Sequence, residues 1–494
     1  MGHLIEDALV VTMDAGRRVL DPGHVLIEGR RLAAVGRGRY PGDRARHEVH
    51  DAAGHIVMPG LVNGHTHSYA NLVKGTLENI PLEIWMLYAM PQGRHMEPED
   101  VVINAALGAI DMLKGGVTCC LDQLAEDREN LALVAREYRR IGLRAVLAPM
   151  FGDVAYGQTL PEVMTLPGGD RPHSGRRAPP TADGILAMVE DLAAECHRPD
   201  EGIVIGVGPS GPQRCTDALL RGSADLADRL DLPIHTHLLE TRAQEVTAYR
   251  LYGRSMVDHL DRLGFLRRRL SLAHAIWLTR EEIDLVAARG ASVVSNPVCN
   301  MGAGSGVPPL LHYRAAGVNV GLGTDGANGP GRQSMFEVMK AAGMAARIQD
   351  WDFARWPTAM DLLAMATSGS ARALGLGDQV GSLEPGKQAD LVLLRRDVPA
   401  LTPLNDVAWQ LVQGVPESAV ERVIVGGRIV VDRGRVLTVD ESAVLRAAAA
   451  RGRRLLDACR DEVAAVRRLH PEMTAMLQRA YATPTKAVAA CWHG

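Results

Sequence analysis

The stretch Ile56-Val57-Met58-Pro59-Gly60-Leu61-Val62-Asn63-Gly64-His65-Thr66-His67 decides how the rest of the chain is interpreted. An apolar run leads into two histidines one residue apart, and side chains two positions apart on a strand lie on the same face. Two imidazoles on one face can bind one metal ion. A His-x-His pair also occurs by chance on surfaces and in cores, so the pair alone does not define a site.

Further apolar runs downstream end in residues of the same chemical kinds. They are Pro233-Ile234-His235-Thr236-His237-Leu238-Leu239-Glu240, Leu270-Ser271-Leu272-Ala273-His274 and Val320-Gly321-Leu322-Gly323-Thr324-Asp325-Gly326. Together with the first stretch they place His or Asp at four expected strand ends. Enzymes built on parallel barrels carry their active sites at such ends.

These motifs resemble the amidohydrolase superfamily, in particular the branch that contains triazine hydrolases and S-adenosylhomocysteine, guanine and cytosine deaminases. The matching segments are 59–67, 237–240, 273–274, 323–326 and the run 381–391, Gly-Ser-Leu-Glu-Pro-Gly-Lys-Gln-Ala-Asp-Leu. They are spread over about residues 5 to 435, so the resemblance covers most of the chain.

The composition indicates a globular enzyme that acts on a small molecule. The 494 residues include 47% hydrophobic and 23% charged residues, and the formal net charge of -4 gives no basic surface for a nucleic-acid partner. No run of 18 apolar residues and no leader pattern is present, so neither a membrane span nor export is expected. Seven cysteines without a disulfide-type spacing favour a reducing, cytoplasmic location.

The order of the expected elements predicts an α/β fold. Short alternating segments before residue 57 and again near 389–394 and 420–431 are typical of strands. Strands and helices alternate between them, which predicts a TIM-like (β/α)8 barrel with a small β-sandwich built from both chain ends. We expect the β-sandwich domain at 1–57 plus 377–438, the barrel at 58–376 and a C-terminal helical extension at 439–494.

Two segments interrupt this alternation. Residues 152–183 are rich in Pro, Gly and Arg and follow a strand, so we interpret them as a lid over the site, although a merely mobile loop fits equally well. Residues 441–480 carry Ala, Leu and Arg at helical spacing, which predicts one or two amphipathic helices packed on the outside or on a partner subunit. A homodimer is expected on this basis and from the resemblance.

The resemblance implies that His65, His67, His237 and Asp325 bind one divalent metal ion. Three imidazoles and a carboxylate suit Zn²⁺, although Fe²⁺ would also accept them. The region 203–210 contains no lysine that could be carboxylated to bridge two metals. We therefore expect a mononuclear site with an open position for water.

The same resemblance implies the catalytic roles. A bound metal lowers the pKa of water toward ~7 and supplies hydroxide as the nucleophile. Asp325 would accept the water proton while it binds the metal, and His274 would orient the hydroxide. Glu240 would carry a proton to the leaving nitrogen, because an amine leaves poorly until it is protonated.

Each of these assignments has an alternative. His235 lies on the same strand face as His237 and could be the ligand instead, although the His-x-x-Glu spacing favours His237. His274 could be a buried histidine satisfied by the backbone. Asp325 could simply cap the next element, as Thr-Asp-Gly often does.

The chain departs from the family pattern where relatives contact their substrates. Ser210 and Ser295 stand where deaminases of this branch carry histidines after the fourth and seventh strands. A purine or nucleoside substrate is therefore doubtful, while hydrolysis is not. The residues we expect to contact substrate are Trp85, Gln213, Arg214 and Asn300, with Met86 as an apolar wall.

The sequence thus predicts a metal-dependent hydrolase that cleaves a C–N bond of a small molecule. The bond is of amide or urea type, or joins an exocyclic amine to an aromatic heterocycle. A nucleobase or nucleoside deaminase and a triazine-type dechlorinase are alternatives within the branch. A non-catalytic ligand-binding member of the fold is the alternative from another class, and Glu240 with His274 argues against it.

Overall fold

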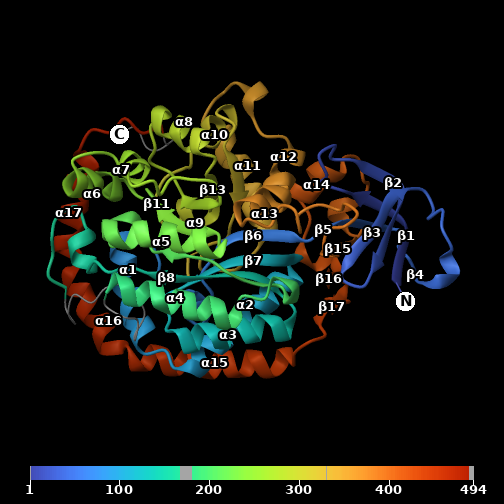
Figure 1. The fold of residues 1–494 in the computed structure, drawn as a ribbon, viewed down its shortest axis with the longest axis horizontal. Helices are drawn as coiled ribbons and strands as arrows, with labels where there is room; N and C mark the ends of the chain where they lie inside the picture. The colour runs from blue at the N-terminus through green and yellow to red at the C-terminus, as the bar shows by residue number, and fades with distance from the viewer. Residues whose placement is uncertain (1, 167–180, 330, 489–494) are drawn as a thin grey trace.

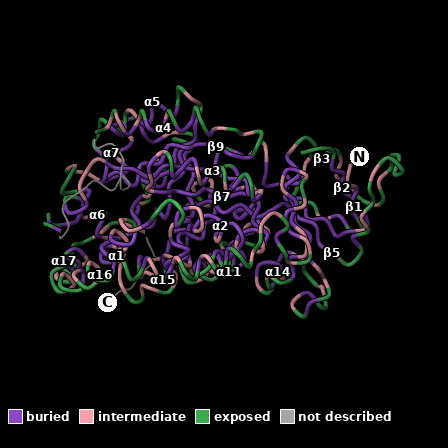
Figure 2. Tube along the Cα trace, turned by 90° about the horizontal axis from the view of Figure 1, so that it is seen from below, coloured by how far each residue is buried: buried purple, intermediate pink, exposed green. Residues whose placement is uncertain are grey.

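The computed structural model describes residues 2–166, 181–329 and 331–488. It is an α/β protein in which a long mixed sheet at one end adjoins a larger part with parallel strands and surrounding helices (Figure 1). Buried residues are concentrated in the strands and the helix faces against them, and exposed residues follow the outer helices (Figure 2).

Both chain ends build the mixed sheet. The early strand β5 (His55–Pro59) pairs antiparallel with the late strand β15 (Leu391–Arg395), which joins two segments more than 300 residues apart. The order is β18-β17-β16-β15-β5-β1-β2-β3, with β4 paired to β1. The remaining strands are β1 (Gly2–Val11), β2 (Val19–Glu28), β3 (Arg31–Arg37), β4 (His47–Asp51), β16 (Val420–Val425), β17 (Arg428–Asp432) and β18 (Arg435–Val436).

Two parallel sheets form the centre of the larger part. The first contains β6 (Leu61–Thr66), β7 (Val117–Leu124), β8 (Arg144–Phe151), β9 (Ile203–Ile205) and β10 (Gly208–Pro209). The second contains β11 (Ile234–Leu238), β12 (Leu270–His274), β13 (Ser292–Ser295) and β14 (Asn319–Leu322). Neighbouring strands within each sheet run parallel, as the alternation of strands and helices predicts.

Contacts link the two sheets at both sides. A parallel bridge joins Val207 to Ile234. On the other side, Asn63 Nδ2 donates to Thr324 Oγ1 at 2.8 Å, and the Thr324 N–H donates to Asn63 Oδ1 at 3.0 Å. A Cβ at Gly64 would lie 2.9 Å from the Leu322 carbonyl oxygen, so glycine permits this close approach.

Helices cover the parallel strands, and the local sequence explains where they begin and end. In α3 (Arg128–Ile141), the Asp127 side chain accepts from the Asn130 N–H at the start, and Gly142 closes the helix at φ 93°. The other helices are α1 (Leu82–Arg94), α2 (Pro98–Lys114), α4 (Ala182–Cys196), α5 (Asp217–Leu230), α6 (Arg242–Tyr252), α7 (Met256–Arg262), α8 (Arg280–Arg289), α9 (Pro297–Gly302), α10 (Leu310–Ala315), α11 (Met335–Arg347), α12 (Ala359–Ala364), α13 (Ser370–Ala373) and α14 (Val407–Gln413).

The C-terminal segment runs along one edge of the larger part and ends beside α1 and α6 (Figure 1). It forms α15 (Glu441–Ala458), α16 (Arg460–Val466) and α17 (His470–Ala482). Met473 and Met476 of α17 are buried in a cluster with Leu87 of α1. This segment therefore supports α1, which carries Trp85. Throughout the described residues, the helices are too short or too polar to cross a bilayer.

Candidate metal centre and active site

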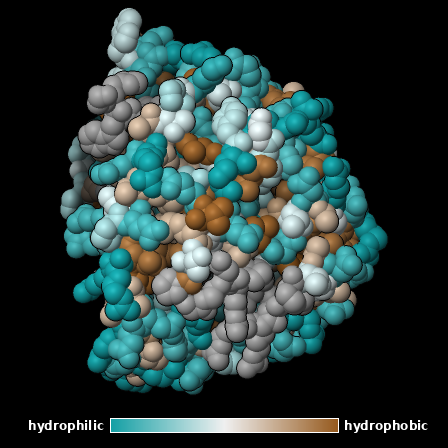
Figure 3. All heavy atoms as spheres, turned by 90° about the vertical axis from the view of Figure 1, so that its left-hand side faces the viewer, coloured by the Kyte–Doolittle hydropathy of each residue, from teal (hydrophilic) through white to brown (hydrophobic). Residues whose placement is uncertain are grey.

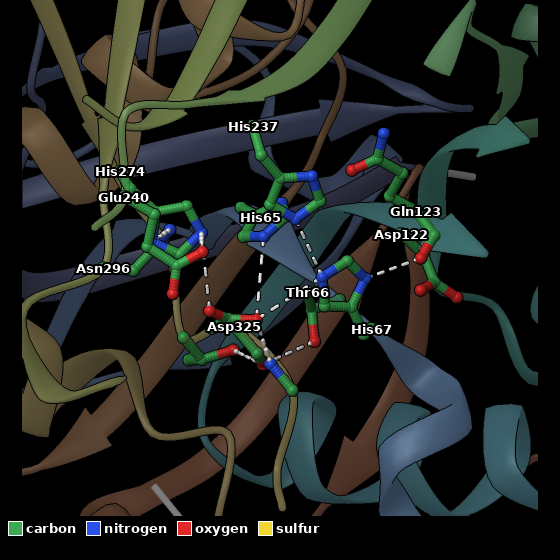
Figure 4. A network of polar contacts seen from close by, with 12 residues as sticks. His65, Thr66, His67, Asp122, Gln123, His237, Glu240, His274, Asn296 and Asp325 are labelled. Carbon is green, nitrogen blue, oxygen red and sulfur yellow. Dashed lines mark hydrogen bonds and ion pairs between the residues drawn. The ribbon is translucent and has the colours of Figure 1, made fainter. Parts of the chain in front are cut away.

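Histidine and carboxylate side chains from separate strand ends converge on one point (Figure 4). His65 lies near the end of β6 and His67 just after it, His237 lies on β11, and His274 is the last residue of β12. Asp325 follows β14 by three residues. The backbone φ angle is 67° at His274 and 64° at Asp325. Non-glycine residues rarely adopt this left-handed conformation, and it is concentrated at functional sites.

The distances between donor atoms suit a single ion. His67 Nε2 lies 3.2 Å from His237 Nε2, and Asp325 Oδ1 lies 3.5 Å from His67 Nε2 and 3.7 Å from His65 Nε2. Ligand atoms around a tetrahedral zinc with bonds of ~2.1 Å are separated by roughly 3.3 Å. His65 Nε2 is buried without a hydrogen-bond partner in the described residues. The donor set therefore fits a metal such as zinc.

Backbone carbonyls orient two of these imidazoles. His67 Nδ1 lies 2.7 Å from the Gln123 carbonyl oxygen, and His237 Nδ1 lies 2.6 Å from the Ser210 carbonyl oxygen. A carbonyl can only accept, so each Nδ1 carries the proton and each Nε2 presents its lone pair to the centre. This is the tautomer that a metal ligand needs.

His235, the alternative ligand, lies behind His65 rather than at the centre. Its Nε2 is 2.8 Å from His65 Nδ1, and its Nδ1 is 2.7 Å from Ser271 Oγ. Both ring nitrogens are thus engaged, whereas His237 points its Nε2 at the cluster. The arrangement places His237 among the converging donors and His235 in a supporting position.

Burial controls the protonation of these groups. It lowers the pKa of His65 and of His237 well below the usual value, with further lowering by neighbouring histidines, and it lowers the pKa of His235 to about 3. Burial acts to raise the pKa of Asp325, but His274 and His67 outweigh it and the net shift is downward. Neutral imidazoles beside an ionised carboxylate are the forms that bind a cation.

Glu240 and His274 form a second group beside the first. His274 Nε2 lies 3.5 Å from Glu240 Oε2 and 3.6 Å from Asp325 Oδ2, and it is buried without a hydrogen-bond partner in the described residues. The other ring nitrogen, Nδ1, lies 2.8 Å from Asn300 Oδ1. His274 is therefore oriented by an asparagine side chain and not by the backbone. Burial, then Asp325 and Glu83, raise the pKa of Glu240 well above its usual value.

Asp325 does not cap the next helix. Its Oδ1 accepts from the N–H of its neighbour Gly326 at 2.6 Å, while α11 begins only at Met335 and is capped by Ser334. The carboxylate is buried and faces the histidines. The Asp325 carboxylate therefore does not occupy the N-cap position of the following helix.

A cavity of about 210 Å³ opens onto these groups. Of the four residues expected to contact substrate, Trp85, Gln213 and Arg214 line it, as does Met86. Asn300 is fully buried and does not line it, because its side chain is turned toward His274. Further residues that were not expected from the sequence also line the cavity, among them Tyr69, Met150, Gln244, Cys299 and Asn328.

The predicted lid is described only in part, since residues 167–180 lie outside the described residues. In the described portion, Leu160 and Met164 are buried against α1 and α17. Tyr156 packs beside Arg214, with the guanidinium carbon 5.0 Å from the ring centre. Residues 152–166 support the cavity wall from behind but do not line the cavity itself.

The face that carries α1, α6 and α17 is seen in Figure 3. It is mostly hydrophilic, and hydrophobic residues gather near its centre. The strands of the parallel sheets end toward this side in Figure 1.

A buried histidine and carboxylate cluster at the ends of parallel strands defines a metal-dependent hydrolase. The chain belongs to the amidohydrolase family, whose model matches residues 56–430. The predicted family is confirmed, as is the predicted class of enzyme, a metal-dependent hydrolase of carbon–nitrogen bonds other than peptide bonds.

Individual members of this family are similar to the chain over most of its length. The 5′-deoxyadenosine deaminase of Methanothermobacter thermautotrophicus is 35% identical over 440 residues, which cover 89% of this chain and 95% of that protein. An adenosine deaminase from Xanthomonas campestris with bound zinc has a TM-score of 0.81 at 29% identity and covers 93% and 98% of the two chains. Atrazine chlorohydrolase from Arthrobacter aurescens, complexed with zinc, has a TM-score of 0.82 at 26% identity and covers 91% and 99%.

Proposed function

We propose that this enzyme uses one zinc ion to hydrolyse the bond between an exocyclic amine and an aromatic nitrogen heterocycle. The observation that carries the proposal is the convergence of three imidazoles and Asp325 beside the Glu240–His274 pair. The deaminases among the similar proteins support the choice of an exocyclic amine over an amide or urea.

In this proposal His65, His67, His237 and Asp325 hold the zinc. When bound, the metal supplies a Lewis acid that makes water nucleophilic near neutral pH. The lone pairs on Nε2 of His67 and His237 are directed inward because each Nδ1 is paired with a carbonyl oxygen. Fe²⁺ would accept the same ligands, and metal analysis of protein from cells distinguishes the two.

Glu240 acts as the proton carrier. Its raised pKa favours the protonated carboxyl group, which is the form that can donate to a leaving nitrogen. His274 Nε2 lies between the carboxyl groups of Glu240 and Asp325, where, with Nδ1 donating to Asn300 Oδ1, it can accept a hydrogen bond from a water molecule. The buried setting keeps bulk water away from both groups and strengthens these interactions.

The test combines zinc analysis with a substrate panel. Purified enzyme should contain close to one zinc per chain and release ammonia from at least one member of a panel of aminopyrimidines, aminopurines and aminotriazines. Amides and ureas in the same panel test the broader hydrolase alternative. Zinc-loaded enzyme that releases ammonia from no panel member would contradict the proposal.

We also propose that the two parallel sheets close into one (β/α)8 barrel over residues 58–376. The Val207–Ile234 bridge and the Asn63–Thr324 hydrogen bonds support closure. The mixed sheet would then fold as a β-sandwich of residues 1–57 and 377–438, followed by the extension 439–494. A crystal structure in which β6 and β14 are separated by an open gap would refute the closed barrel.

A homodimer in the cytoplasm completes the proposal. Large hydrophobic side chains are exposed around α11 and α14, namely Met344, Ile348, Trp351, Phe353 and Trp409. Such a group favours a subunit interface. Light scattering should give twice the chain mass for wild type and a smaller mass for Trp351→Ser, and a monomeric wild type would refute the dimer.

Free cysteines among the described residues, such as Cys119 and Cys120, suit a reducing compartment such as the cytoplasm. Cell fractionation tests this location.

A further inference from the structure

Arg214 occupies an unusual position in the cavity wall. It ends the short 3-10 turn Pro212–Arg214 after β10, and only 7% of the residue is exposed. It lines the cavity together with Gln213 and Gln244. One face of its guanidinium lies over the Tyr156 ring. A cationic side chain is thus held in a buried wall a short distance from the proposed metal ligands.

The Arg214 guanidinium has few partners for so buried a group. One terminal nitrogen, Nη1, donates to Ser210 Oγ at 3.3 Å, and Nε is buried without a hydrogen-bond partner in the described part of the chain. A guanidinium has five N–H donors. Among the described residues, no carboxylate oxygen comes within the 4.0 Å of an ion pair with Arg214. Burying a cation without an anion is unfavourable, and buried charges are normally paired, so an anionic group of a ligand or substrate would complete the pair.

The two buried carboxyl groups in this part of the site have other partners. Glu83 accepts a hydrogen bond from the Thr241 hydroxyl. Glu240 faces His274, with 3.5 Å between its Oε2 and Nε2 of the histidine. Each carboxyl group contributes to the field around Arg214, but neither pairs with it directly. The guanidinium therefore keeps donors available to the cavity.

Ser210 connects this arrangement to the change in the family pattern. Its carbonyl oxygen orients His237, while its hydroxyl accepts from Arg214. Ser210 is one of the two positions at which the sequence departs from the family resemblance. The hydroxyl of Ser210 is an acceptor for the guanidinium of Arg214. Ser210 thus fixes both His237 and Arg214 at the cavity wall.

We propose that Arg214 binds an oxyanion on the substrate, a carboxylate or a phosphate-type group, and so selects anionic aminoheterocycles. This inference rests on the proposed function, which assigns the exocyclic amine as the reacting group of the substrate. It adds that the substrate carries a negatively charged group at its other end. The planar guanidinium suits two parallel hydrogen bonds to such a group. Gln213 and Gln244 line the same cavity and would contact the adjoining part of the ring. Gln213 Oε1 is buried and has no hydrogen-bond partner among the residues that the structure describes.

The test measures binding and not turnover, so it is independent of whether the proposed reaction occurs. Calorimetry with zinc-loaded enzyme compares 6-aminonicotinate, its neutral amide 6-aminonicotinamide, and (6-aminopyridin-3-yl)phosphonate. These probes share one ring and differ in the charged group. Wild type should bind at least one anionic probe ten or more times tighter than the amide, and the better anion identifies the natural group.

Three variants make the result specific to this side chain. Arg214→Met should abolish the preference for the anion, and Arg214→Lys should retain part of it while preserving the positive charge. Arg221→Met, on the exposed face of α5, should match wild type. Equal affinity for the three probes, no binding of any, or a preference that survives Arg214→Met would overturn the inference. Ammonia release from a neutral substrate would then still support the proposed function.

Discussion

The imidazole of His235 lies directly behind that of His65, with 2.8 Å between Nε2 of the first and Nδ1 of the second. His235 is itself fixed by Ser271 Oγ at 2.7 Å. Both histidines of the His-Thr-His run on β11 thus serve one site, one at the centre and one in support. Partners of this kind set the tautomer and the orientation of a metal ligand.

Replacing His235 should therefore weaken metal binding without removing a proposed ligand. His235→Phe leaves His65 Nδ1 unpaired, and we expect zinc affinity to fall by about 10- to 100-fold. Competition with a chromophoric chelator measures the change. His259→Phe is the matched control, because His259 pairs with Asp217 and is not among the residues that line the cavity. Unchanged zinc affinity in His235→Phe would contradict the supporting role.

Glu240 should affect turnover and not metal content. Glu240→Gln keeps the shape of the side chain but removes the transferable proton, so kcat should fall by about 10²- to 10⁴-fold. Zinc should remain near one per chain, as measured by mass spectrometry of the metal. Full activity in this variant would refute the proton-carrier role. Loss of zinc would indicate that Glu240 helps to hold the metal.

A buried ion pair joins the mixed sheet to the parallel strands. Arg144 Nε and Nη2 donate to the Asp390 carboxylate at 2.8 and 3.1 Å, and both side chains are almost fully buried. Arg144→Met leaves the carboxylate buried without its cation, so the free energy of unfolding should fall by about 3–5 kcal/mol. Urea denaturation measures it. Arg229→Met breaks a similar but exposed pair with Glu190 and should cause no resolvable change.

Asp361 should make stability depend on pH in acid. Burial acts to raise its pKa, but Arg17, Thr358 and Arg314 outweigh this, and the pKa lies well below its usual value. A depressed pKa stabilises the folded state above the unfolded-state pKa of about 3.9, and this contribution is lost as the pH falls through the folded-state pKa. The gap in unfolding free energy between wild type and Asp361→Asn should be constant above about pH 5 and shrink below pH 4. A gap that does not vary with pH would contradict this assignment.

How much of the site could be predicted depended on whether the signal was local. His65 and His67 sit in one short run whose strand periodicity gives their common direction, and His237 precedes Glu240 by a fixed spacing. Asn300 and His235 were different, because their partners come from other strands and only the folded chain shows which way each side chain turns. Tyr69, two residues after His67, lies in the 3-10 helix Ser68–Val73, so strand periodicity did not indicate that it lines the cavity.

The same distinction between local and long-range signals applies to the fold. Repeated strands and helices predicted the parallel α/β arrangement, because hydrophobic periodicity reports on each element separately. The pairing of β5 with β15 depended on segments far apart in the chain, and the sequence indicated it only through similar texture at both ends. The start of α3 at Arg128 reflects the side-chain cap at Asp127.

The most direct test is the position of zinc in a crystal, located by anomalous scattering at the zinc edge. We predict one peak about 2.0–2.2 Å from Nε2 of His65, His67 and His237 and from a carboxylate oxygen of Asp325. Zinc found only elsewhere, for example at the surface group of His3, Glu48 and His50, would contradict the proposed metal centre. So would a zinc-soaked crystal without a peak between these four side chains.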